Sequence, residues 1–339
     1  MSLADRLAAL GALGAHLRAG KDDYLAAVIK RTEFHNAWFT EANQRAALAG
    51  IAEHMLQPEL LQAWVDGYAW PADQPVRTIG LVMAGNLPVV GFHDVLCVFV
   101  AGHRAKIKLS DKDPYLLPYL LKLLDDFLPG AATYFEIVDR LSDFDAVIAT
   151  GSNNSLRYFK SYFGEYPHIL RGNRNGVAVL TGEETPEQLL ALGRDVFDFF
   201  GLGCRNVAKL YLPAGYDLDP LLEALHEYRE IVLHTKYKNN FDYNYAVMVL
   251  NKVSFRANGC ILLMENPSLQ SSIACLHYEY YADLSQLHGE LQQRAGEIQV
   301  VVGLVEMPGL PVVPFGQAQA PGLADYADGV DAVAFLLDL

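Results

Sequence analysis

The first 65 residues have the periodicity of helices. Leucines recur every three or four residues and predict one apolar face along a first helix over residues 3–19, which Ser2 is suited to cap: Leu3, Leu7, Leu10, Leu13 and Leu17. Two further helices are predicted near residues 22–31 and 41–55, the second capped by Thr40. The aromatic segment 65–70, which ends before Pro71, is expected to form a short edge element.

From residue 78 onward, short apolar runs alternate with helical segments. Strands are predicted over residues 78–84, 105–109, 133–138, 145–150 and 177–180, and helices over residues 89–101, 114–127, 154–163 and 186–200. Asp113 is expected to cap the helix that Pro114 opens, and Thr185 begins the last helix with a capping-box pattern. This alternation predicts a doubly wound, mainly parallel sheet.

A second α/β unit is expected to follow, to about residue 305. Its predicted elements are a strand over 207–212, a helix near 217–228, a strand near 244–250 and a helix near 284–294. Residues 333–339 are apolar enough for a terminal strand. The Tyr- and Asn-rich stretch Lys236–Tyr245 is compatible with a packed hairpin or with the lining of a substrate site.

Composition narrows the class of protein. The chain has 339 residues, of which 52% are hydrophobic and 19% charged, as in an ordered globular protein. The net charge of −14 argues against nucleic-acid binding, because a phosphate backbone requires a basic surface. We find no apolar run long enough to span a membrane and no signal peptide, so we expect a cytoplasmic protein.

The four cysteines are scattered, with no CxxC pair, so neither a disulfide framework nor a zinc site is predicted. Cys204 differs from the others because it follows two glycines, in Phe199–Asn206, between an apolar helix and a strand. Glycines leave a thiol open to approach and let the backbone turn sharply. Cys204 is therefore a candidate nucleophile, and the alternative is a buried structural thiol.

Polar residues follow the first strand of the predicted sheet. Asn86, in Ala84–Pro88, stands at a carboxyl strand end, where open α/β sheets bind ligands. An amide donor there suits the oxyanion that forms when a thiol attacks a carbonyl, although Asn is also common in turns. No G-x-S-x-G motif is present to support a serine hydrolase.

Two further segments are candidates for binding a phosphorylated cofactor. Alternation places Arg104, Lys106 and Lys108 on one face of a strand that leads into Ser110 and Asp111, which suits a ribose and its phosphates or a solvated strand edge. Gly151 and Ser152 lie between a strand and a helix, whose N-terminus suits a pyrophosphate. The usual G-x-G-x-x-G fingerprint is absent.

In this order, the segments resemble the aldehyde dehydrogenase superfamily. Asn86 matches the family's oxyanion-hole Asn, Gly102 to Asp111 matches its ribose-binding strand end, and Thr150–Ser152 matches its Thr-Gly-Ser turn. The segment Gly201–Cys204 is similar to its nucleophile motif, and Glu265, before Asn266 and Pro267, is the nearest match to its nicotinamide-ribose carboxylate. The resemblance implies an aldehyde-dehydrogenase-like fold of two doubly wound α/β domains with an N-terminal helical segment.

Within the superfamily, the chain most resembles the bacterial acyl-CoA reductases of the LuxC type. The segments that carry this likeness are Val313–Gln319, Asp325–Asp331 and Lys236–Tyr245. One departure from oxidising members is that Leu170 stands where they carry the Glu that activates water. The resemblance then implies slow hydrolysis of an acyl-enzyme and favours reduction, with His168 as a candidate proton donor or a surface His.

The resemblance also assigns roles to segments of the chain. Residues 1–181 are expected to bind the nicotinamide cofactor, residues 182–310 to carry Cys204, and residues 311–339 to return to the cofactor domain or to form an oligomerisation strand. The implied reaction is reduction of an acyl-CoA, expected to be a fatty acyl-CoA, to the aldehyde. We expect NADPH, because Asp111 is shorter than the family's Glu and Arg104 and Lys106 suit a 2′-phosphate, with NADH as the alternative.

The resemblance further implies a homodimer and a partner enzyme that supplies the acyl group. Two other functions stay open. One is a cysteine-dependent acyltransferase or thioesterase without redox chemistry. The other is a catalytically inactive scaffold of the same fold.

Overall fold

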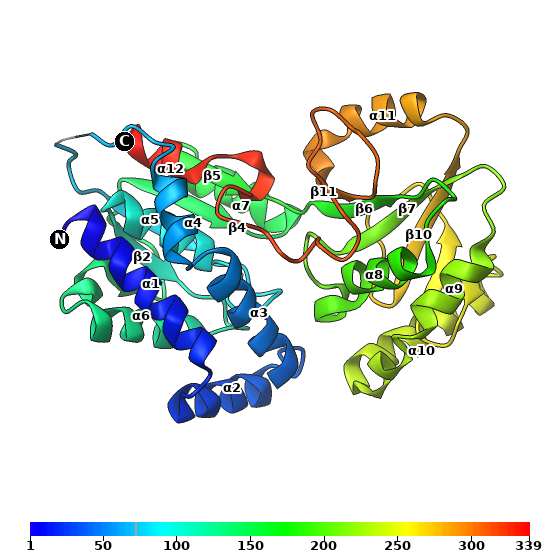
Figure 1. The fold of residues 1–339 in the computed structure, drawn as a ribbon, viewed down its shortest axis with the longest axis horizontal. Helices are drawn as coiled ribbons and strands as arrows, with labels where there is room; N and C mark the ends of the chain where they lie inside the picture. The colour runs from blue at the N-terminus through cyan, green and yellow to red at the C-terminus, as the bar shows by residue number, and fades with distance from the viewer. Residues whose placement is uncertain (72) are drawn as a thin grey trace. The chain divides into compact units, whose positions relative to one another are not determined.

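The chain folds into two compact units, each built around one sheet. The computed structural model describes residues 1–71 and 73–339 (Figure 1). The first unit comprises Met1–Asn173 together with Pro321–Leu339, and the second comprises Arg174–Ala320. The sequence predicted domain boundaries after residues 181 and 310. The two units divide after residues 173 and 320 instead, so strand β6 (Asn175–Val179) and the segment 311–320 belong to the second unit.

The sheet of the first unit has five parallel strands in the order β3-β2-β1-β4-β5. They are β1 (Thr78–Val82), β2 (Arg104–Lys108), β3 (Phe135–Ile137), β4 (Ala146–Thr150) and β5 (His168–Arg171). The chain leaves β1 in one direction to form β2 and β3, and later in the other to form β4 and β5. This reversal beside β1 is the place where open sheets of this kind bind ligands, at the carboxyl ends of the strands.

Helices precede and surround this sheet. They are α1 (Leu3–Ala19), α2 (Asp23–His35), α3 (Glu41–His54), α4 (Pro58–Val65), α5 (Phe92–Ala101), α6 (Leu116–Phe127) and α7 (Asn153–Phe163). Ser2 and Thr40 cap α1 and α3 as predicted, because each hydroxyl accepts a backbone N–H of the first turn. The expected edge element at 65–70 is wrong: Pro58 opens α4, which ends at Val65.

The end of the chain is a helix, so the predicted terminal strand is wrong. Residues Ala332–Leu337 form α12, which packs beside α5 in the first unit (Figure 1). The Asp331 carboxylate caps it by accepting the N–H of Ala334 at 2.9 Å. Val333 and Leu336 are fully buried, a spacing of three residues that suits one face of a helix.

The second unit has a seven-stranded sheet in the order β12-β11-β6-β7-β10-β9-β8, parallel except for β8 at one edge. Besides β6, its strands are β7 (Val207–Pro213), β8 (Arg256–Ala257), β9 (Leu262–Glu265), β10 (Cys275–Tyr281), β11 (Ile298–Val302) and β12 (Val312–Val313). Its helices are α8 (Pro186–Phe197), α9 (Leu218–His226), α10 (Thr235–Leu250) and α11 (Leu284–Gln293). Two α/β units preceded by helices confirm the predicted fold class.

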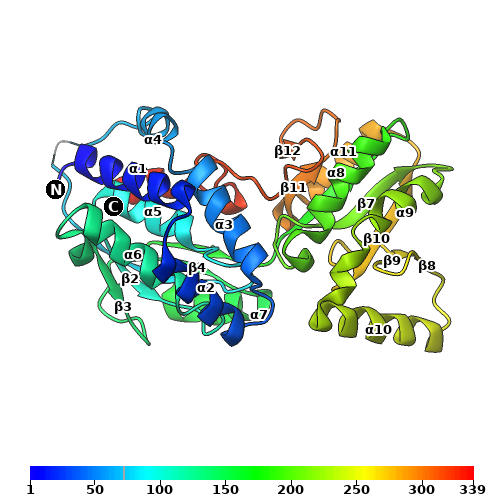
Figure 2. The same cartoon turned by 60° about the horizontal axis from the view of Figure 1, so that its bottom comes forward.

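The stretch Lys236–Tyr245 lies within α10, a continuous helix (Figure 2). The packed hairpin and the strand near 244–250 are therefore wrong. His234 caps the helix by accepting the N–H of Tyr237, and the buried side chains Tyr237, Phe241 and Met248 follow helical spacing. Helical periodicity is weak here because Asn and Tyr are interspersed on both faces.

Asp113 does not cap a helix, contrary to expectation. Helix α6 begins only at Leu116, with no side-chain cap, and the Asp113 carboxylate instead accepts the N–H of Val89 at 2.7 Å. Val89 has a φ of 48°, a left-handed conformation that is unusual for a β-branched residue. Asp113 thus holds a strained residue in the loop between β1 and α5.

Asp113 should make the first unit less stable as pH rises. Burial raises the pKa of its carboxyl from 3.8 to about 6. Between these values the folded protein keeps a proton that the unfolded chain has released. This contribution to stability is complete below pH 3.8 and is lost as pH rises through 6, amounting to about 2–3 kcal/mol.

We expect Asp113→Asn to remove this part of the pH dependence. All three tryptophans (38, 64 and 70) belong to the first unit, so urea unfolding followed by tryptophan fluorescence reports on it. Asp139→Asn, at an exposed position, is the control and should follow the parent protein. The assignment would be contradicted if Asp113→Asn lost as much free energy of unfolding between pH 5 and pH 8 as the parent protein does.

Candidate active site

Cys204 lies on a short turn between α8 and β7 and is exposed to solvent. The other cysteines, Cys97, Cys260 and Cys275, are buried. Burial raises the pKa of the Cys260 and Cys275 thiols to about 11 and raises that of Cys97 well above its ordinary value. Cys204 is thus the cysteine that a reagent or substrate can approach.

The turn before Cys204 is strained. Phe199, Phe200 and Gly201 have φ values of 54°, 60° and 72°, so three consecutive residues are left-handed. Only the glycine adopts this conformation without cost, and each phenylalanine is disfavoured by roughly 1 kcal/mol or more. Surrounding contacts must therefore hold the turn in place.

The buried side chain of Asn206 supplies these contacts. Its Oδ1 accepts the N–H of Gly203 at 2.8 Å, across the Cys204 turn. Its Nδ2 donates to the backbone carbonyl oxygens of Asp195 at 3.0 Å and Asp198 at 2.9 Å, at the end of α8. One amide therefore joins the turn to the helix and satisfies the last carbonyls of that helix.

Asp195, in α8, joins this helix to the loop 316–318, which lies shortly before the chain returns to the first unit. Its buried carboxylate accepts the N–H groups of Gly316 at 2.6 Å and Ala318 at 2.9 Å. Burial raises its pKa to about 6, although these two N–H groups act in the opposite direction. Arg205 donates from Nε to the carbonyl oxygen of Ala318. The loop 316–318 and the Cys204 turn are therefore held by one network.

The start of α10 packs against the same turn. The rings of Phe200 and His234 stack with centroids 4.2 Å apart, and the ring centroid of Tyr237 lies 6.2 Å from that of Phe200. The Tyr- and Asn-rich stretch is thus helical, and its first turn lies beside the segment that presents Cys204. Sequence reasoning did not find His234 or Asn206, because nothing in their local sequence shows what they contact.

Sheet register places Glu265 away from Cys204. Strands β7 and β10 are parallel and pair His277 with Lys209, while β9 pairs Glu265 with Tyr278. Cys204 precedes β7, at the amino edge of the sheet, whereas Glu265 ends β9, at the carboxyl edge. The segment that leads into β10, which includes Ser272 and the left-handed Ala274 (φ 62°), lies at the same edge as Cys204.

The carboxyl edge of the first sheet gathers the other predicted residues. Asn86 follows β1, Ser110 and Asp111 follow Lys108 at the end of β2, and Gly151 and Ser152 follow β4. Because β1 pairs with both β2 and β4, the three loops lie at the same edge. Asn86 is half-buried and Asp111 is exposed.

Two glycines keep these loops narrow. A Cβ on Gly85 would lie 2.1 Å from Ser110 Oγ, and a Cβ on Gly151 would lie 2.9 Å from Ser155 Cβ. The side chain of Ser152 caps α7 by accepting the N–H of Ser155. Close-packed backbone and a helix N-terminus at a carboxyl strand edge fit the ribose and pyrophosphate of a dinucleotide.

Three other candidates lie elsewhere in the unit. Arg104 begins β2, at the amino edge, and the Lys106 ammonium group donates to the carbonyl oxygen of Ser142 at 2.8 Å. Neither Arg104 nor Lys106 lies with Asp111 for a 2′-phosphate, whereas Lys108 ends β2 close to Asp111. His168 begins β5, also at the amino edge, with Nδ1 2.8 Å from the oxygen of Tyr166.

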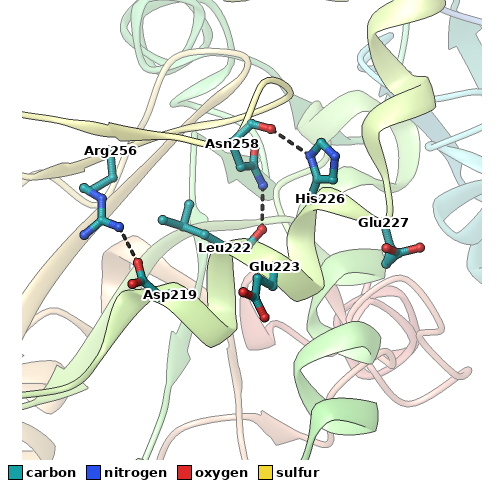
Figure 3. A pocket seen from close by; sticks show the side chains of 7 residues that line it. All are labelled: Asp219, Leu222, Glu223, His226, Glu227, Arg256 and Asn258. Carbon is teal, nitrogen blue, oxygen red and sulfur yellow. Dashed lines mark hydrogen bonds and ion pairs between the residues drawn. The ribbon is translucent and has the colours of Figure 1, made fainter.

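The second unit also has an open pocket of about 460 Å³ between α9 and the segment 256–258 (Figure 3). Three of its seven lining residues are acidic, and none of the seven is a predicted site residue: Asp219, Leu222, Glu223, His226, Glu227, Arg256 and Asn258. Arg256 pairs with Asp219, and His226 Nδ1 lies 2.7 Å from the carbonyl oxygen of Asn258. Among residues 1–71 and 73–339, no three His, Cys, Asp or Glu side chains are placed to hold a metal ion.

No protein-family model and no curated protein matches this sequence. Solved structures do match it. Aldehyde dehydrogenase 21 from Physcomitrella patens, in complex with the reaction product succinate, has a TM-score of 0.67 and 14% identity, covering 100% of this chain and 84% of that chain. The P. syringae indole-3-acetaldehyde dehydrogenase AldA, in complex with NAD⁺, has a TM-score of 0.63 and 14% identity, covering 94% and 74%.

An aldehyde dehydrogenase from Mycobacterium tuberculosis complexed with NAD⁺ gives a TM-score of 0.62 and 14% identity, covering 89% of this chain and 73% of that chain. These comparisons show that the chain has the aldehyde dehydrogenase fold. No helix in the described part of the chain is long and apolar enough to cross a membrane.

We predict that the loops after β1 and β2 bind a nicotinamide cofactor and that Gly85→Ala weakens this binding. The added methyl group would collide with the side chain of Ser110 and push apart the loops after β1 and β2. We expect the Kd for NAD(P)H, measured by nucleotide fluorescence, to rise at least roughly tenfold, as expected when a close loop contact is displaced.

Gly50→Ala is the matched control, because a Cβ at Gly50, within α3, would meet nothing within 4 Å. It should bind the cofactor normally and be slightly more stable, since Ala favours helices over Gly. Equal cofactor affinity in the two variants would show that these loops do not form the binding site.

Proposed function

We propose that the protein reduces acyl-CoA thioesters to aldehydes with NAD(P)H, and that Cys204 carries the acyl group. The observation that supports this most directly is the exposed thiol of Cys204 on a strained turn that Asn206 holds in place. The chain shares its fold with aldehyde dehydrogenases, one of which is complexed with NAD⁺, and this supports nicotinamide-dependent chemistry.

In the first step, the Cys204 thiolate attacks the carbonyl carbon of the thioester. A new C–S bond forms to Cys204, the C–S bond to coenzyme A breaks, and coenzyme A leaves with a proton from solvent. The backbone N–H of Cys204 and the side-chain amide of Asn86 are proposed to donate hydrogen bonds to the oxyanion.

In the second step, the acyl group becomes the aldehyde. The reduced nicotinamide, when bound, supplies a hydride to the acyl carbon. Cys204 leaves as a thiolate when its C–S bond breaks, ready for another cycle. Lys108, Ser110 and Asp111 are proposed to bind the adenosine ribose, and Gly151 and Ser152, at the start of α7, the pyrophosphate.

The direction of the reaction is supported by Leu170. This apolar, half-buried side chain near the end of β5 stands where the resemblance to aldehyde dehydrogenases places the water-activating Glu of oxidising enzymes. Without a general base, the Cys204 thioester should resist hydrolysis and await hydride.

We propose NADPH as the preferred cofactor, with NADH as the alternative. Lys108 is the cation at the carboxyl end of β2 that suits a 2′-phosphate, whereas Asp111 would favour the 2′-hydroxyl of NADH. Steady-state reduction with each nucleotide separates the two.

The central test uses Cys204→Ala with acyl-CoA substrates of several chain lengths. The parent protein should gain an acyl adduct by intact-mass spectrometry without cofactor and should consume NAD(P)H when cofactor is added. Cys204→Ala should do neither, and Asn86→Ala should slow acylation by about 10²–10³. Cys275→Ala, which removes a buried thiol, is the control and should keep both properties.

Three results would contradict the proposal. An adduct on another residue would displace Cys204 as the nucleophile. Release of coenzyme A without NAD(P)H consumption would indicate an acyltransferase or thioesterase. A parent protein that forms no adduct and consumes no NAD(P)H would indicate an inactive scaffold.

Leu170→Glu should convert the acyl-enzyme to one that hydrolyses. A carboxylate at this position can act as a general base, so we expect release of free acid from the isolated acyl-enzyme to rise at least about tenfold. Leu170→Gln has a similar shape but no base and should hydrolyse at the parent rate. Equal rates in Leu170→Glu and Leu170→Gln would show that position 170 does not face the acyl group.

A further inference from the structure

The end of α2 lies against the loop that follows β2. His35, the last residue of α2, donates from Nε2 to the carbonyl oxygen of Asp111, 2.7 Å away. The next residue, Asn36, donates from Nδ2 to the carbonyl oxygen of Lys112 at 3.2 Å. Two consecutive side chains therefore hold two consecutive carbonyl groups of a loop that comes 76 residues later in the chain.

Two further contacts hold the far end of the same loop. The guanidinium carbon of Arg31, one turn before His35, lies 4.0 Å from the ring centroid of Tyr115. The rings of His35 and Tyr115 meet edge to face, with their centroids 5.3 Å apart. A cation over an aromatic face adds attraction to these contacts. Helix α2 thus holds the loop from Asp111 to Tyr115, immediately before α6 begins.

Helix α2 is itself firmly held within the first unit. At its start, the Asp22 carboxylate accepts the hydroxyl group of Tyr119, in α6, at 2.6 Å. In its middle, the buried side chain of Gln44, in α3, donates to the carbonyl oxygen of Ile29 at 3.0 Å, and the side chain of Ile29 is fully buried. The end of α2 is therefore a fixed support for the loop.

The held loop includes Ser110 and Asp111, which the proposed function places at the adenosine ribose, so the inference rests on that proposal. Within the loop, Ser110 accepts two N–H groups. Its Oγ accepts that of Lys112 at 3.3 Å, and its carbonyl oxygen accepts that of Asp113 at 3.0 Å. Asp111 is exposed, and its backbone is fixed by α2 on one side and by these turns on the other.

The contacts from α2 matter because residues 109–115 form neither a helix nor a strand. A loop that is free to move has to be ordered when a ligand binds, and this ordering costs free energy. Here His35 and Asn36 order the backbone when the protein folds. A ribose that binds to Ser110 and Asp111 then meets a loop that already has its shape.

We propose that His35 and Asn36 are positioning residues, which fix the loop after β2 so that Ser110 and Asp111 bind the adenosine ribose of the nicotinamide cofactor. In this role they touch neither the cofactor nor the acyl group. Loss of either side chain should weaken cofactor binding and leave the chemistry at Cys204 unchanged.

The test measures the Kd for NADPH and for NADH by nucleotide fluorescence, which requires no acyl transfer. His35→Ala should raise the Kd of the more tightly bound nucleotide about fivefold, the size expected for one lost hydrogen bond. His35→Gln still carries a side-chain donor and should bind within about twofold of the parent protein. His54→Ala is the matched control, because the exposed His54 ends α3 as His35 ends α2, and it should bind like the parent.

A double-mutant cycle separates positioning from a general effect on the fold. If His35 acts through Asp111, His35→Ala should change the Kd by less than about twofold in a protein that already carries Asp111→Ala. A merely structural role would weaken binding by the same factor with or without the Asp111 carboxylate. In steady-state assays, His35→Ala should raise the KM for the nucleotide and leave kcat unchanged.

Three results would overturn the proposal: an unchanged Kd in His35→Ala, an equal loss of affinity in His35→Ala and His54→Ala, and an equal effect of His35→Ala in the two backgrounds of the cycle. If His35→Ala fails to fold by circular dichroism, Asn36→Asp takes its place in the cycle. This variant keeps the side-chain oxygen that accepts the N–H of Trp38 at 3.2 Å and loses the donor to Lys112.

The reductase reaction is tested separately by NADPH consumption with acyl-CoA. A protein that binds the nucleotide but does not consume it would refute the reductase reaction and keep the role of His35. Reduction without any effect of His35→Ala on nucleotide binding would do the opposite. A parent protein that binds neither NADPH nor NADH would overturn both.

Discussion

The position of Cys204 depends on one buried amide. Phe199 and Phe200 occupy left-handed conformations that side chains of this kind rarely adopt, and Gly201 continues the turn in the same conformation. Asn206 opposes this strain through three hydrogen bonds, one to the turn and two to the end of α8. The segment that carries the thiol therefore has its shape before any substrate binds. The nucleophile is already oriented, so substrate binding does not have to order it at a cost in entropy.

Much of the fold could be predicted because its signals are local. Ser2, Thr40 and Thr185 cap helices through contacts within one turn, so their sequence neighbourhood contains the whole interaction. The errors occur where distant contacts decide. Asp113 resembles a helix cap, but it accepts the N–H of Val89, and the apolar end of the chain is a helix because it packs on α5.

The candidate site shows the same division. Cys204 and Asn86 were found because glycines and strand ends mark them in the sequence, and their roles remain proposals. Glu265 was chosen from a short motif, but register, which arises only when strands pair, puts it at the edge opposite Cys204.

The path of the chain has a consequence for biosynthesis. The second unit is continuous, from Arg174 to Ala320, whereas the first requires both the beginning of the chain and Pro321–Leu339. A ribosome therefore releases all residues of the second unit before the first can bury Val333 and Leu336. Until α12 has been made, the surface of α5 that it covers is open to water, so nascent chains that already contain the second unit would be exposed to aggregation or to capture by chaperones.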